Sequence, residues 1–143
     1  MKILLLVTGG RGGSDFFQGL LDGHSQILQF PGLFNNKNIF QILDLKDPYN
    51  ISNKFINTFP NFFNSKHGTQ LSRRERHDRL GPKKDKHYKV SKTKFIKNFV
   101  NISNEKKKLT KLDVLQNLHI AYDRSKQKKK QKKKNNYCAY SYC

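Results

Sequence analysis

The stretch Ile3-Leu-Leu-Leu-Val7, Thr8-Gly-Gly-Arg-Gly-Gly-Ser14 and Asp15-Phe-Phe-Gln-Gly-Leu-Leu21 decides the predicted fold. Its first part is wholly aliphatic, which is typical of a strand covered on both faces, as in a parallel sheet. Four glycines then permit a tight loop, and Ser14 is a good N-cap for a helix. That helix would place four apolar residues on one face: Phe16, Phe17, Leu20 and Leu21. We predict a buried strand, a glycine loop and an amphipathic helix.

The loop between this strand and helix has the chemistry of an anion-binding site. Unpaired backbone N–H groups and the positive end of the helix dipole would converge there, with Arg11 beside them. The loop lacks the Lys-Ser or Lys-Thr pair of a Walker A sequence and the third glycine of the dinucleotide fingerprint. We predict anion binding, and the alternative is a glycine-rich turn without a ligand.

Residues 3 to 32 resemble the 5′-phosphosulfate-binding loop of the sulfotransferases that use 3′-phosphoadenosine 5′-phosphosulfate (PAPS). Arg11 falls on the basic position of the family pattern, Gly13 on its glycine and Ser14 on its first hydroxyl residue. Further matches follow without a gap at the family's spacing: Phe16-Phe17, Leu20-Leu21, His24 and Ile27. The resemblance therefore covers less than a quarter of the chain.

The sequence departs from the family pattern at Asp15, where a second hydroxyl residue is usual, and at Ser25, where proline is usual. A carboxylate near a bound phosphate would repel it, although Asp15 can instead complement the N-terminus of the helix. His24 could act as a base, but a histidine that contacts the last carbonyls of a helix is the commoner case. Residues 27–32 are predicted as a second strand, ended by Pro31.

The resemblance implies an α/β fold, a three-layer P-loop-type domain with a parallel sheet, of which this chain would hold the N-terminal part. PAPS would be the co-substrate, and the family reaction moves its sulfuryl group to a hydroxyl or amine acceptor. Arg11 would hold the phosphosulfate through two hydrogen bonds. Main-chain N–H groups would donate further hydrogen bonds from Gly12, Gly13, Ser14 and Asp15, and the hydroxyl of Ser14 would add one more. The family's second motif, which binds the 3′-phosphate, has no counterpart here, so weak binding without transfer activity is expected.

The charge of the chain favours a rival function. Its 143 residues are enough for one domain, and they include 29 Lys and Arg against 10 Asp and Glu, a net charge of +19. Seven of the lysines lie in residues 126–134, which leaves +12 on residues 1–125. The alternative hypothesis is a small basic protein that binds RNA or anionic surfaces through its lysine-rich segments.

Residues 126–143 do not fit the predicted domain, which spans residues 1–125. A lysine run is usually a solvated, disordered tail, and Asn135–Cys143 has no apolar periodicity. Lysine codons are rich in adenine, and an adenine is easily gained or lost in a run of them. We therefore predict that this tail is out of frame or that the chain is truncated. Cys138 and Cys143 both lie in the tail, where an accidental pair is favoured over a disulfide or a metal site. No export signal or membrane span is predicted, and the expected location is cytoplasmic.

The middle of the chain predicts helices. Residues 33–67 should form short helices interrupted at Pro48 and Pro60, with a core stripe of Ile51, Phe55 and Ile56. Residues 68–89 are predicted to be an exposed basic connection, either solvated or facing an acidic or sugar substrate.

Two longer helices are predicted after this connection. From Ser91, apolar residues recur at helical spacing: Phe95, Ile96, Phe99 and Val100. Thr110 and Asp113 resemble a capping box that opens the next helix. That helix should turn five residues toward the core: Leu112, Leu115, Leu118, His119 and Tyr122. His119 is predicted to be a packed helix residue, and no metal-ligand cluster or catalytic triad is recognisable.

Overall fold

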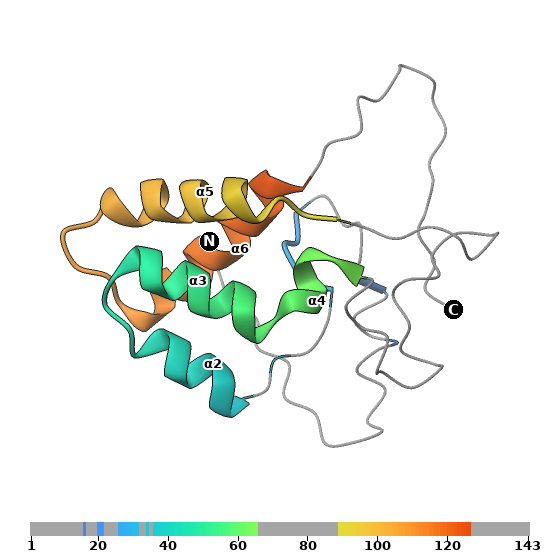
Figure 1. Cartoon of the computed structure of the whole chain (residues 1–143), viewed down its shortest axis with the longest axis horizontal. Coiled ribbons are helices and arrows are strands. Elements are labelled where there is room, and N and C mark those ends of the chain that lie inside the picture. The colour runs from blue at the N-terminus through green and yellow to red at the C-terminus, as the bar shows by residue number, and fades with distance from the viewer. Residues whose placement is uncertain are drawn as a thin grey trace, which may run out of the picture.

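The computed structural model of the chain describes Phe16, Leu20, Leu21, residues 26–31, Phe34, residues 36–65 and residues 89–126. This part of the chain is mostly helical (Figure 1). Its helices are α2 (Asn36–Leu43), α3 (Pro48–Thr58), α4 (Pro60–Phe63), α5 (Lys92–Asn104) and α6 (Lys111–Ser125).

The helices begin where the sequence supplies caps. Pro48 is the first residue of α3, and Pro60 is the first residue of α4. Backbone N–H groups in the first turn of a helix have no intrahelical partner, so the N–H that proline lacks removes no hydrogen bond there. The carboxylate of Asp47 caps α3 by accepting a hydrogen bond from the backbone N–H of Asn50 at 2.7 Å. Ser91 caps α5 in the same way. The predicted interruptions at the two prolines and the predicted helix after Ser91 are therefore confirmed.

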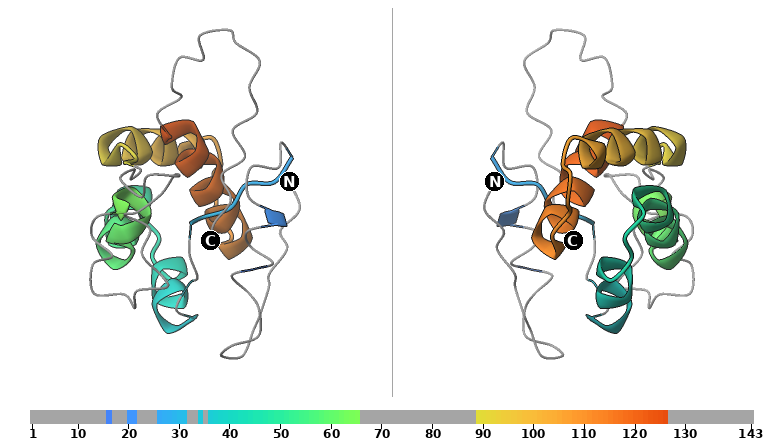
Figure 2. Two further views of the ribbon diagram at one scale, coloured as in Figure 1. Left: turned by 90° about the vertical axis from the view of Figure 1, so that its right-hand side faces the viewer. Right: turned by 90° about the vertical axis from the view of Figure 1, so that its left-hand side faces the viewer.

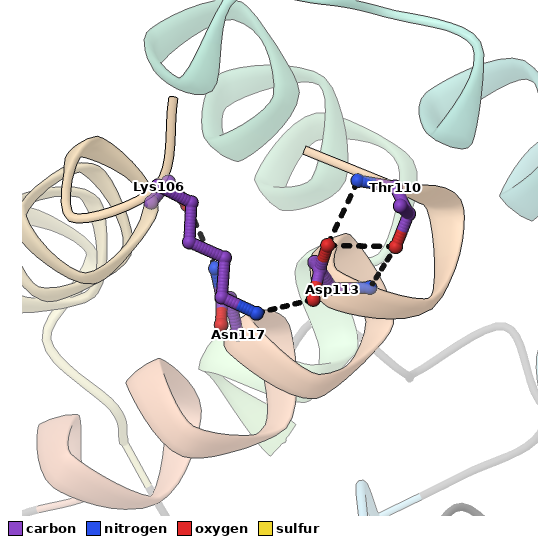
Figure 3. A network of polar contacts seen from close by, with 5 residues as sticks. Lys106, Thr110, Asp113 and Asn117 are labelled. Atoms are coloured by element: carbon purple, nitrogen blue, oxygen red, sulfur yellow. Dashed lines mark hydrogen bonds and ion pairs between the residues drawn. The ribbon is translucent and has the colours of Figure 1, made fainter. Parts of the chain in front are cut away.

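Helix α6 opens with the predicted capping box. The hydroxyl oxygen of Thr110 accepts a hydrogen bond from the backbone N–H of Asp113 at 3.1 Å, and the Asp113 carboxylate accepts one from the backbone N–H of Thr110 at 2.9 Å. Lys106 forms an ion pair with the same carboxylate (Figure 3). Hydrogen bonds from Lys106 and then from Thr110 hold the pKa of Asp113 well below its usual range. An aspartate thus completes a motif that usually uses glutamate.

The four longer helices surround one hydrophobic core. Helix α3 packs against α2 and α5, and α6 packs against α5 and α2. Figures 1 and 2 show α5 and α3 lying alongside each other, with α6 behind them. Aromatic rings dominate the core, whose buried phenylalanines are Phe30, Phe55, Phe59, Phe62, Phe63, Phe95 and Phe99.

The predicted stripes account for part of this core. In α3 the stripe of Ile51, Phe55 and Ile56 is buried, and in α5 so are Phe95 and Phe99. In α6 the stripe holds for Leu118 and Tyr122, which are both buried, and for Leu115, which is partly buried. It fails for Leu112, which lies in the first turn of α6 and is 54% exposed. A spacing pattern identifies which face of a helix is turned inward. It does not show over which turns of that helix the neighbouring helices cover this face.

The predicted α/β fold with a parallel sheet is wrong for the described residues. They contain two isolated antiparallel bridges, Asn64 to Lys89 and Val90 to Lys126, but no strand of a sheet. Residues 27–30, which belong to the second strand predicted over residues 27–32, have no regular secondary structure. An extended segment becomes a strand only beside another strand that completes its hydrogen bonds, and the partners of this segment are helices.

The first predicted strand, residues 3–7, lies outside the described residues. In the predicted first helix, Phe16, Leu20 and Leu21 are helical. However, Phe16 is 74% exposed and Leu20 is 63% exposed, while Leu21 is partly buried. We predicted that Phe16, Leu20 and Leu21 pack against a sheet, and this is wrong at Phe16 and Leu20.

Candidate functional site

The anion-binding loop predicted from the sequence lies outside the described residues. Its predicted ligands, and the histidine considered beside them, are Arg11, Gly12, Gly13, Ser14, Asp15 and His24. Their roles stay predictions. The same holds for the exposed connection predicted before Lys89 and for the tail that follows Lys126.

The segment that follows the predicted loop is held in the aromatic core by Phe30. This side chain is 3% exposed, and its ring centroid lies 4.4 Å from that of His119, 4.7 Å from Tyr122 and 5.5 Å from Phe62. Phe34 adds an edge-on contact to Phe30 at 5.3 Å. Aromatic pairs of this kind add about 0.5–1.5 kcal/mol beyond the burial of their surface. Residues 26–31 are thereby fixed to α4 and α6.

The role of Phe30 was missed because the apolar run around it predicts a strand. Its position directly before Pro31 favours an extended backbone, which a strand also has, so it gave no signal for packing against helices. Its partners in α4 and α6 lie far along the chain, so sequence spacing does not reveal them.

Two buried polar pairs join α6 to its neighbouring helices. The phenol of Tyr122 donates a buried hydrogen bond to the backbone carbonyl of Phe62, which joins α6 to α4. The side-chain amide of Asn117 donates to the hydroxyl of Ser103 at 3.2 Å, which joins α6 to α5. A buried polar group without a partner costs about 1–3 kcal/mol, so these pairs specify one register between the helices. Sequence reasoning missed Asn117, although it lies three residues after the buried Val114.

His119 is a packed helix residue, as predicted. Its Nδ1 lies 2.8 Å from the backbone carbonyl oxygen of Leu115, and because a carbonyl only accepts, Nδ1 carries the proton and donates. Burial lowers the pKa of His119, the hydrogen bond to Leu115 opposes this effect, and the positive charge of Lys126 adds to it. The neutral imidazole is therefore the form that packs against Phe30.

We expect the folded state to lose stability when the pH falls through the ordinary pKa of His119, which is 6.5. Since the folded-state pKa is lower, the unfolded state binds more protons between the two values, and the free energy of unfolding falls as the pH falls. For this one group the slope has an upper limit of about 1.4 kcal/mol per pH unit. Urea unfolding from about pH 8 to about pH 5 measures it. The His119→Phe variant should have a flatter profile, and an unchanged slope in this variant would contradict the assignment.

Neither a metal site nor a membrane span is seen in the part of the chain that the structure describes. No group of three His, Cys, Asp or Glu side chains there is placed to hold a metal ion. Its helices are also too short or too polar to cross a membrane.

Comparison of the chain with protein-family models, with curated proteins and with solved structures finds no match. The resemblance to the PAPS-binding loop therefore rests on the residues from Arg11 to Ile27 themselves.

Proposed function

We propose that residues 11–15 bind the 5′-phosphosulfate end of PAPS. The chain would then be related in function to sulfotransferases, which move a sulfuryl group to a hydroxyl or amine. The observation that carries this proposal is the ungapped register of family positions from Arg11 to Ile27.

The residue types of the loop suit this ligand. In-line sulfuryl transfer builds negative charge on the leaving phosphate, as phosphoryl transfer does, and fixed N–H groups with one cation stabilise that charge. Arg11 supplies a planar fork that matches two oxygens of the anion. Gly12 and Gly13 let the main chain approach closely, since they carry no Cβ.

Calorimetric titration with 3′-phosphoadenosine 5′-phosphate tests this proposal. We expect weak binding that falls about tenfold to a hundredfold in the Arg11→Ala variant, because a charged hydrogen-bonded contact contributes about 1.5–3 kcal/mol. Arg124→Ala is the matched control, since it removes the same charge from an exposed position at the end of α6. His24→Ala should change little. Labelled-sulfate transfer to mixed acceptors should show no turnover.

Two results would count against the proposal. If Arg11→Ala and Arg124→Ala weakened binding equally, the affinity for the nucleotide would depend on the net charge of the chain rather than on the loop. If the unmodified chain bound no nucleotide at all, the resemblance to sulfotransferases would carry no function.

The net charge of +19 favours a second candidate, a basic protein that binds RNA or anionic surfaces through its lysines. The affinity for RNA should fall steeply between low and moderate salt, whereas the affinity for a single nucleotide should depend less on salt. Deletion of residues 126–143 should abolish it if the lysine run is the binding element.

A further inference from the structure

Helix α5 carries a row of lysine and asparagine side chains on the face turned away from the core. Phe95 and Phe99 are fully buried on its inner face. Four exposed residues, spaced three, four and three apart, form the α5 row on the opposite face: Lys94, Lys97, Asn101 and Asn104. Figures 1 and 2 show α5 at the outer edge of the helices. These four side chains are therefore not part of the described core.

The turn after α5 extends the charge of this row. Lys106, Lys107 and Lys108 follow the helix and are exposed, and Lys106 is paired with Asp113. No ion pair among the described residues involves Lys94, Lys97, Lys107 or Lys108. Glu105 is the one acidic residue between Lys92 and Lys111 in the sequence. The outer side of α5 is therefore an open, positively charged surface.

We propose that the α5 row, together with Lys107 and Lys108, binds the phosphate backbone of a nucleic acid. Residues 94–104 span about 15 Å at 1.5 Å per helical residue. That length matches about four or five phosphates at a rise of 3.4 Å per nucleotide in one strand. Lysines neutralise phosphates, and the amides of Asn101 and Asn104 both donate and accept hydrogen bonds, so they can also bind sugars and base edges.

A nucleic acid fits this surface better than a membrane does. A helix that binds a membrane surface inserts an apolar face among the lipid headgroups. The large apolar side chains of α5 are instead in the core, where Phe95 and Phe99 are fully buried and Ile96 is partly buried. The α5 row itself is wholly polar, which leaves only charge to attract a lipid.

Fluorescence anisotropy with a labelled RNA of about 12 nucleotides, measured with the full chain over a range of salt concentrations, tests the proposal. In the Lys94→Gln/Lys97→Gln variant, the slope of log K against log salt should become shallower by about 1.4, because each phosphate contact to a single strand contributes about 0.7. The matched control is Lys37→Gln/Lys54→Gln, which removes the same charge from exposed positions on α2 and α3. All lysines of the tail are kept in both variants.

Two further measurements sharpen this test. Asn101→Ala/Asn104→Ala should weaken RNA binding without changing the salt slope, since the amides carry no charge. A DNA strand of the same sequence identifies the contacted group: an equal effect of the lysine variant on DNA and RNA supports backbone recognition. Circular dichroism of each variant shows whether the helices are kept.

Three outcomes would overturn the proposal. One is an equal change of slope in the two lysine variants, which would mean that the chain responds to net charge alone. Another is RNA binding that none of the α5 variants affects. The third is a larger effect of Lys94→Gln/Lys97→Gln on binding to phosphatidylserine vesicles than on binding to RNA. The α5 row shares no residue with the proposed anion loop, so nucleotide titration can fail or succeed independently of RNA binding.

Discussion

Replacing Phe55 by alanine should lower the free energy of unfolding by about 3–5 kcal/mol, the usual range for a fully buried phenylalanine. Phe55 is fully buried in α3, the helix that packs against both α2 and α5. Its ring lies between 5.2 and 6.2 Å from six other rings: Phe30, Phe34, Phe59, Phe62, Phe63 and Phe95. Because small domains are stable by only about 5–15 kcal/mol, this loss would remove a large part of the free energy of unfolding and shift the transition to lower urea.

Urea unfolding followed by circular dichroism measures the effect of Phe55→Ala. The matched control is Phe40→Ala in α2, which deletes the same atoms from a side chain that is 58% exposed. An exposed substitution should change the free energy of unfolding by only about 0.5 kcal/mol. Equal losses in the two variants would mean that the core is not centred on α3.

The helices of residues 36–125 could be predicted because their signals are local. A proline such as Pro48, a cap such as Ser91 and the Thr110 capping box each act within one turn, and a sequence displays them directly. The burial of individual side chains could not be predicted as well. Phe40 and Phe55 are the same residue type in neighbouring helices, and only the positions of the other helices make one exposed and the other buried.

The sheet was predicted wrongly because a short apolar run does not specify its partners. Residues 27–30 have the composition of a strand, yet Phe30 is buried against α4 and α6. The polar pairs were missed for the opposite reason, since an asparagine such as Asn117 is typical of a surface. For the candidate site, sequence could suggest Arg11 and Ser14 from residue types and spacing. No described contact tests them.

Replacing Phe30 by alanine should release residues 26–31 from α4 and α6 while the helices remain folded. Truncation of a buried phenylalanine removes about 3–5 kcal/mol, but an undocked segment can cost no more than its own docking free energy. The helices keep contacts that do not involve Phe30, such as the ring pair of Phe55 and Phe95 at 5.6 Å. Amide hydrogen exchange should therefore accelerate in residues 26–31 far more than in α5. Ile27→Ala is the control, because Ile27 is 36% exposed in the same segment.

The same variant links the helical core to the proposed nucleotide site. If the buried Phe30 fixes the chain that leaves the loop, then Phe30→Ala adds an ordering cost to binding and weakens the affinity for 3′-phosphoadenosine 5′-phosphate. Calorimetric titration of Phe30→Ala beside Ile27→Ala measures this cost. Unchanged affinity in Phe30→Ala would show that the loop holds its ligand without help from the core. If α5 and residues 26–31 instead lost protection together, Phe30 would belong to the cooperative core and the segment would have no separate docking step.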